Sequence, residues 1–157
     1  MNAQGATKPS SHQIGADLEA DTERLLQGWG INFVPKKAFV TAHGNVVTPD
    51  FWLPATKQRP SVIIECKNFG VMAKRTSDSR RRKAQEALYL MVQIRRYCSE
   101  TAQSRIIVVT GSQGFTVDQI KLLTAELQPD FHVLSVSNLK LFRELIDQNK
   151  ACDPCHI

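Results

Sequence analysis

Two acids and a lysine have the types and spacing of a catalytic group. Asp50 follows a proline, and Glu65 and Lys67 stand on either side of Cys66 at the end of an apolar run. Side chains alternate between the two faces of a strand, so Glu65 and Lys67 are expected to point the same way. If the segments around Asp50 and Glu65 pair as a hairpin, two carboxylates and an ammonium group meet at one end of a sheet. The alternative is a core strand whose charged end lies in water.

Two carboxylates beside a lysine suit the hydrolysis of phosphodiesters with a divalent metal ion. Hard cations such as Mg²⁺ prefer carboxylate and water oxygens. The metal polarises a phosphoryl oxygen and activates water, and the lysine stabilises the negative charge that develops. Paired carboxylates raise one another's pKa unless a cation neutralises them. Such a site is therefore expected to be incomplete without metal.

A helix is expected before these residues. Apolar residues with helical spacing begin at Ile14, and Gly28 and Gly30 are expected to end the helix. Residues 1–13 lack apolar periodicity and are predicted to form a flexible tail. Residues 31–35 predict a short extended segment that leaves the helix.

A meander is expected next. Residues 38–41 and 45–48 have the composition of strands and flank a turn at residues 43–45. His43 is expected to be only a turn residue. Together with the strand that ends at Lys67, these segments predict a three-stranded antiparallel meander.

The rest of the chain alternates helix and strand. The pattern predicts a long helix over residues 80–98, a strand over 105–110, an amphipathic helix over 116–127, a strand over 130–135 and a last helix capped by Ser137. The whole order predicts one α/β domain over residues 14–148, with a mixed sheet of a three-strand meander plus two further strands, flanked by helices. Residues 149–157 are expected to form a C-terminal tail.

Charge is unevenly distributed along the chain. The 157 residues carry a formal net charge of +5, and basic residues gather in one loop and the helix start that follows it: Lys74, Arg75, Arg80, Arg81, Arg82 and Lys83. The helix dipole disfavours cations in a first turn, so these charges are expected to serve a ligand. A polyanion such as DNA fits this patch. A solvated helix face is the alternative.

Other features restrict the setting. No apolar run reaches the roughly 20 residues that span a bilayer, and the N-terminus lacks the apolar stretch of a signal peptide. Four sparse cysteines favour a reducing, cytoplasmic location. Cys152, Cys155 and His156 offer three zinc ligands, with His132 or Cys98 as a fourth. A loosely packed tail is the alternative for this last group.

The motif and the order of elements resemble the PD-(D/E)xK nuclease superfamily, which has the restriction-endonuclease-like fold. Asp50 after its proline and Glu65-Cys66-Lys67 match the short motif, and the elements over residues 14–148 match the order of the superfamily core. The resemblance implies that Asp50 and Glu65 bind metal through their carboxylates and Cys66 through its main-chain carbonyl. It implies that Lys67 is the catalytic lysine.

The resemblance also implies residues outside the short motif. Many members add an acid on the first helix, and Glu19 stands eleven residues before Gly30, as in resolvase-like members. Glu23, one turn later, is the alternative, as is an exposed surface acid. Gln85 and Tyr89 resemble the Gln-x-x-x-Tyr element of the exonuclease branch, with an ordinary core-flanking pair as the alternative.

The function that the resemblance implies is a Mg²⁺-dependent DNA endonuclease, with Mn²⁺ able to substitute. A type II restriction-type enzyme is preferred over a DNA repair or Holliday-junction-resolving nuclease. One core holds one site and cuts one strand, so double-strand cleavage implies a homodimer. Two other classes are alternatives: a non-cleaving DNA-binding module on the same fold, and an unrelated α/β domain whose acids are surface charges.

Overall fold

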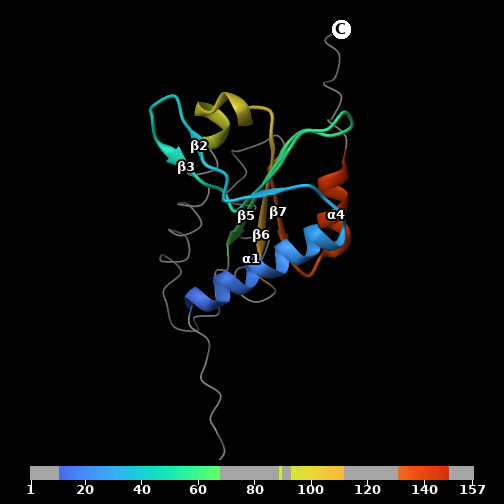
Figure 1. Ribbon diagram of the computed structural model, residues 1–157. Coiled ribbons are helices and arrows are strands. Elements are labelled where there is room, and N and C mark those ends of the chain that lie inside the picture. Colours follow the sequence, from blue (N-terminus) through green and yellow to red (C-terminus); the bar gives the residue numbers. More distant parts are fainter. Residues whose placement is uncertain (1–10, 68–88, 90–92, 112–130, 149–157) are drawn as a thin grey trace, which may run out of the picture.

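The computed structural model describes residues 11–67, 89, 93–111 and 131–148 (Figure 1). Its elements are helix α1 (Ser11–Gly28), strands β1 (Val34–Pro35), β2 (Phe39–Val40), β3 (Val46–Val47), β4 (Phe51–Leu53) and β5 (Val62–Lys67), the 3₁₀ turn η1 (Ser99–Thr101), strands β6 (Arg105–Thr110) and β7 (Phe131–Ser135), and helix α4 (Leu139–Asp147). In the second half, the described residues include the predicted strands β6 and β7 and the predicted last helix, α4.

The main sheet has five strands in the order β1-β4-β5-β6-β7. The β1–β4 and β4–β5 pairs are antiparallel, and the β5–β6 and β6–β7 pairs are parallel. The sheet is therefore mixed, and an α/β architecture is confirmed. The predicted strand over residues 105–110 is confirmed as β6, and the one over 130–135 is confirmed as β7 at its described residues, 131–135.

The predicted meander is wrong in which strands it joins. Strands β2 and β3 pair only with each other in a separate two-stranded sheet, and β1 and β4 are the antiparallel strands beside β5. Pro49 interrupts the chain between β3 and β4, and proline has no N–H for a sheet ladder. Burial favours β4 as well, because Phe51 and Leu53 are both buried, whereas each strand of the hairpin buries one residue of two.

Strands β5 and β6 form the buried centre of the molecule. Residues 62–66 and all six residues of β6 are buried. Parallel strands need cover on both faces, which explains why both segments are almost continuously apolar. The last residue of β5, Lys67, is only half-buried.

Helices α1 and α4 cover the same face of the sheet. Leu18 and Leu26 of α1 and Phe142 of α4 belong to one core cluster with Ile64 of β5. The ring of Trp29, just after α1, meets Phe142 edge-on with 5.4 Å between centroids. Figure 1 shows α1 passing in front of the strands, with its last turn beside α4. This packing fixes α1 across the sheet.

The helix ends differ in detail from the predictions. Helix α1 begins at Ser11, so three residues assigned to the N-terminal tail are helical. Gly30 has a φ of 67°, as expected for a residue that ends a helix. Helix α4 is capped by Asn138 and not by Ser137 as predicted: the Asn138 side chain accepts a bond from Leu141 N at 3.3 Å, while the Ser137 hydroxyl bonds to that of Ser135.

Some predictions lie outside the described residues. These are the start of the long helix, the helix over 116–127, and the tails at residues 1–10 and 149–157. Of the long helix, Tyr89 and residues 93–97 are described and are helical, and Ile94 and Cys98 are buried as predicted. No helix in the described parts of the chain has the length and apolar character needed to cross a membrane.

Arg105 is a buried cation that ties two elements together. Only 1% of this residue is exposed. Its Nη1 donates to the carbonyl oxygens of Leu145 and Gln148, both at 2.8 Å, at the C-terminal end of α4. Carbonyls at a helix end lack partners within the helix, so a cation there satisfies them and complements the helix dipole. The first residue of β6 thus anchors the last helix.

Arg105→Met is expected to destabilise the fold by about 2 kcal/mol or more, because it leaves a buried and a partly buried carbonyl oxygen without their charged donor. Lys140→Met, on the exposed side of α4, is the matched control and is expected to change stability by less than about 0.5 kcal/mol. Denaturation in urea measures both. Equal stability of the two variants would contradict the anchoring role of Arg105.

Candidate functional site

The β4–β5 hairpin brings Asp50 to Glu65. Phe51 is paired with Ile64, so Asp50 lies next to Glu65 at the end of the hairpin. The main-chain N–H of Asp50 donates to Glu65 Oε2 at 3.3 Å, and Asp50 Oδ2 accepts from the main-chain N–H of Cys66 at 2.7 Å. Asp50 and Glu65 are 5% and 4% exposed. The predicted hairpin is therefore present, and both carboxylates are buried at the ends of their strands.

Lys67 lies on the same side of β5 as Glu65, as strand alternation predicts. Its Nζ is 2.9 Å from Glu65 Oε1. Burial opposes the charged form of Lys67, but the charge and hydrogen bond of Glu65 outweigh it and raise the pKa of the ammonium. Lys67 is therefore a cation, held against a buried acid.

Glu65 is under opposing influences. Burial raises the pKa of its carboxyl above the ordinary value, and the charge of Asp50 raises it further. The charge and hydrogen bond of Lys67 act in the opposite direction and do not cancel the rise. Two buried acids this close together favour a cation between them, which is the condition expected of a metal-binding pair.

Lys36 joins the cluster from the edge of the sheet. Its ammonium contacts Asp50 Oδ1 and lies 2.9 Å from Oε2 of Glu19 on α1. Burial opposes its charged form, but hydrogen bonds to Asp50 and Glu19 prevail and raise the pKa of Lys36. Glu19 thus reaches the cluster, whereas Glu23 forms no ion pair with Lys36 or Lys67.

Sequence reasoning missed Lys36, although its signal is local. Pro35 is paired with Phe51, and the N–H of Lys36 continues this contact by donating to the Asp50 carbonyl at 2.9 Å. Lys36 has a φ of 49°, a left-handed conformation that is uncommon outside glycine. A lysine one residue beyond an edge strand is a usable pointer when that strand pairs with the one next to a predicted site acid. That pairing was not predicted.

The neighbouring lysine has a different environment. The Nζ of Lys37 lies 3.7 Å from the centroid of the Trp52 ring and 3.4 Å from Glu100 Oε2. A cation over an aromatic face is attracted by the ring quadrupole. Lys36 and Lys37 therefore face different partners, and only Lys36 touches the acids of the site.

Cys66 serves the site through its main chain. Its Sγ points to α1 and donates to Thr22 Oγ1 at 3.4 Å. Burial raises the pKa of the thiol, so it is not a nucleophile at neutral pH. Side chains alternate along β5, so Glu65 and Lys67 lie on one face of the strand and the thiol of Cys66 lies on the other, in the core.

The donor set suits a hard divalent ion, although lysines now neutralise it. Among the described residues, no group of three or more His, Cys, Asp or Glu side chains is arranged to hold a metal. Ammonium groups lie where a cation would be bound, Lys36 between Asp50 and Glu19 and Lys67 against Glu65. Carboxylate oxygens gathered around a positive charge are the ligands that Mg²⁺ prefers. The residues present fit such an ion once one ammonium has left.

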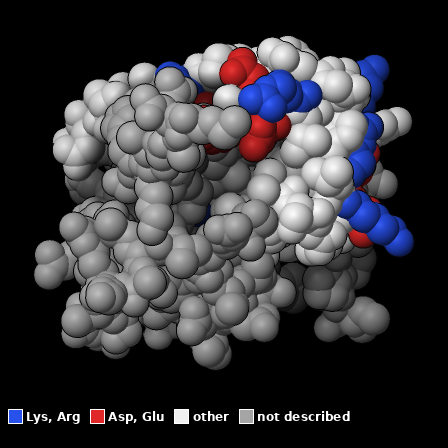
Figure 2. Space-filling view, turned by 90° about the horizontal axis from the view of Figure 1, so that it is seen from below, with Lys and Arg blue, Asp and Glu red and all other residues white. Residues whose placement is uncertain are grey.

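The other predicted site residues are only partly placed. Tyr89 is helical and 67% exposed. Gln85, its predicted partner, lies outside the described residues, as do Lys74, Arg75, Arg80, Arg81, Arg82, Lys83, Cys152, Cys155 and His156. His43 lies in a turn, as predicted, and its ring is tilted by 60° against that of Tyr97, with 4.7 Å between centroids. On the described surface in Figure 2, acidic and basic side chains lie next to each other.

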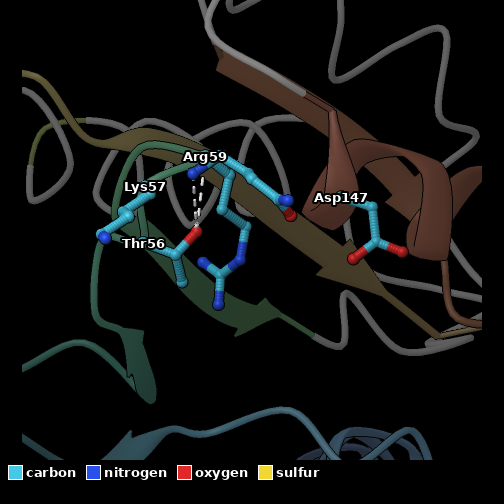
Figure 3. Close-up of a pocket in the computed structure, with 5 residues that line it drawn as sticks. Thr56, Lys57, Arg59 and Asp147 are labelled. Carbon is cyan, nitrogen blue, oxygen red and sulfur yellow. Dashed lines mark hydrogen bonds between the residues drawn. The ribbon is translucent and has the colours of Figure 1, made fainter.

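A polar hollow lies at the other end of β5. It has a volume of about 520 Å³ and is lined by Thr56, Lys57, Gln58, Arg59 and Asp147. The Thr56 hydroxyl accepts from the main-chain N–H groups of Gln58 and Arg59, both at 3.2 Å, which closes the turn. Figure 3 shows Asp147 facing this turn from the end of α4. The hollow lies before β5 and is separate from the acids at its end.

Searches of protein-family models, curated proteins and solved structures found no match to this chain.

Glu65→Gln is expected to remove a pH-dependent loss of stability in metal-free protein. An acid with a raised pKa in the folded state binds protons more readily there than when unfolded. Its ionisation then costs stability as pH rises above its ordinary value of 4.5 and through the folded pKa. The stability of Glu65→Gln relative to wild type is therefore expected to increase over that rise in pH.

Thermal unfolding in EDTA from pH 4 to 8 measures this difference. Glu144→Gln, at an exposed position of α4, is the control and is expected to run parallel to wild type. A constant offset between Glu65→Gln and wild type at all pH values would contradict the prediction.

Proposed function

We propose that the protein is a divalent-metal-dependent DNA endonuclease of the PD-(D/E)xK type. The observation that carries this proposal is the contact between Asp50 and Glu65 at the end of the β4–β5 hairpin, with Lys67 at 2.9 Å from Glu65. Buried carboxylates beside a lysine at the end of a sheet suit phosphodiester hydrolysis, and the short motif of the superfamily falls on these same three residues.

The acids and the main chain have the binding role. The carboxylates of Asp50 and Glu65 and the main-chain carbonyl of Cys66 would hold Mg²⁺, for which Mn²⁺ would substitute. The bound ion supplies a Lewis acid for the phosphoryl oxygen and lowers the pKa of water. The N–H of Cys66 orients the Asp50 carboxylate by donating to Oδ2 at 2.7 Å, and Glu19 is a further acid on the side of α1.

Lys67 has the electrostatic role. Its ammonium is held by Glu65 and is half-exposed, so it faces both the buried acid and the solvent from which a substrate arrives. A fixed cation at this place stabilises the charge that develops on the phosphate and positions the attacking water. Its raised pKa keeps it protonated at neutral pH.

DNA is the proposed substrate because of charge and motif together. The chain has a net charge of +5, and six basic residues between positions 74 and 83 are proposed to contact the phosphate backbone. A type II restriction-type activity is preferred, with a homodimer for double-strand cuts, and repair or junction resolution is the alternative. The buried free thiols of Cys66 and Cys98 suit a reducing, cytoplasmic compartment.

Asp50→Asn, Glu65→Gln and Lys67→Met are each expected to reduce Mg²⁺-dependent plasmid cleavage by about 10²-fold or more, because the first two weaken metal binding and the third removes the charge that stabilises the reacting phosphate. Lys57→Met, in the exposed loop at the other end of β5, is the matched control and should cleave as wild type does. Equal cleavage by all variants would refute the site.

The pattern of products separates the alternatives. Double-strand cuts at fixed positions indicate restriction, and nicks that depend on DNA structure indicate resolution or repair. DNA binding without cleavage at any divalent metal indicates a non-cleaving module. The absence of both binding and cleavage indicates an unrelated domain with surface acids.

Glu19→Gln and Glu23→Gln are expected to differ, although the two acids lie one turn apart on α1. Only Glu19 is in the cluster, through Lys36. Glu19→Gln is therefore expected to raise the Mg²⁺ concentration needed for half-maximal cleavage by about threefold to tenfold, while Glu23→Gln has no effect. A larger effect of Glu23→Gln would assign the fourth acid to that position.

A further inference from the structure

The Lys36 ammonium contacts Asp50 Oδ1, an oxygen that a metal ion would use as a ligand. One oxygen of Asp50, Oδ2, accepts from the Cys66 main chain, so Oδ1 is the oxygen left for a cation. The ammonium of Lys36 contacts that Oδ1 and also Glu19 Oε2. We infer that Lys36 is an exchangeable counter-ion, which holds Asp50 and Glu19 together in metal-free protein and withdraws when a divalent ion binds. This inference rests on the proposed metal-dependent function.

The backbone and the side chain of Lys36 are held independently. The main chain is fixed, because its N–H donates to the Asp50 carbonyl and Pro35 is paired with Phe51. The side chain is 53% exposed, in contrast to 6% for that of Asp50. The ammonium can therefore move into solvent while the β1–β4 pairing stays intact, and no refolding is needed for the exchange.

The charges of the cluster favour the exchange. Three carboxylates (Glu19, Asp50 and Glu65) face two ammonium groups (Lys36 and Lys67). A divalent ion in place of the Lys36 ammonium neutralises the acid that is left over, and Lys67 keeps its contact with Glu65. An ammonium and a divalent ion at the same oxygen of Asp50 repel each other, so the lysine and the metal compete. The competition lowers the apparent affinity of the site for metal.

Lys37 provides an internal comparison. It is the adjacent residue with the same side chain, but it lies over the Trp52 ring and pairs with Glu100, away from the acids. If loss of one positive charge alone changed the metal affinity, substitution of either lysine would change it equally. A change seen only on substitution of Lys36 is specific to its contact with Asp50 and Glu19.

The test is Mn²⁺ binding by the full chain of wild type, Lys36→Met and Lys37→Met. Electron paramagnetic resonance measures the Mn²⁺ that stays free in each titration. Lys36→Met is expected to bind Mn²⁺ about tenfold more tightly than wild type, because the competing cation is gone. Lys37→Met is expected to bind as wild type does. Without metal, Lys36→Met is also expected to melt below wild type, and saturating Mn²⁺ should close that gap.

Mn²⁺ binding by Lys36→Met that equals or falls below a measurable wild-type affinity overturns the inference, while cleavage by the wild type leaves the proposed function standing. A wild type that neither binds Mn²⁺ nor cleaves DNA overturns both. Lys36→Gly serves as the second variant, since glycine suits the positive φ at this position and the same increase in affinity is expected of it.

Discussion

The antiparallel pairing of β4 with β5 is the constraint on which the rest of the site depends. Leu53 to Phe51 pair with Val62 to Ile64, and this register alone sets Asp50 beside Glu65. A shift by one residue would move every side chain of a strand to the other face. The register is strongly specified because Leu53, Val62 and Ile64 are all fully buried. The chemistry at one end of the hairpin is thus positioned by apolar packing along its length.

The site is costly for the fold, and the surrounding structure compensates. Two carboxylates that are about 95% buried are unfavourable without counter-charges. Each has a lysine, and each lysine is half-exposed, so the cations are only partly dehydrated. At the opposite end of the sheet the buried charge is positive: Arg105 is a buried cation, and carbonyl oxygens accept its hydrogen bonds. The stability of the fold therefore comes from the core cluster and the anchored α4, rather than from the acids.

Part of the fold could be predicted from periodicity and composition. Strands β5 and β6 are visible as apolar runs, and the pairing of β4 with β5 follows from two extended segments joined by a polar connection. The placement of β2 and β3 was not predictable in this way, because a two-residue strand with one buried side chain has little signal. Only the position of Pro49 distinguishes a separate hairpin from a continuous meander.

The site, like the fold, could be predicted from the sequence only in part. Asp50, Glu65 and Lys67 follow from their types and the alternation of a strand, but the choice of Glu19 over Glu23 rests on the resemblance alone, because helical spacing puts both acids on nearly the same face of α1. Lys36 needs the edge pairing of β1, which depends on contacts distant in sequence. Asp50, Glu65 and Lys67 could thus be predicted from a strand pattern, Glu19 only from the resemblance to a family, and Lys36 from neither.

Cys66 connects two requirements that are usually met by different residues. Its N–H binds Asp50, while its side chain fills the space next to Thr22. The peptide group is common to nearly all amino acids, so the contact with Asp50 imposes no side-chain identity at this position. The core limits its size, because the thiol lies against Thr22 of α1. A small apolar residue at position 66 would therefore keep the contact with Asp50, whereas a bulky residue there would act indirectly, by pushing α1 and Glu19 away from the sheet.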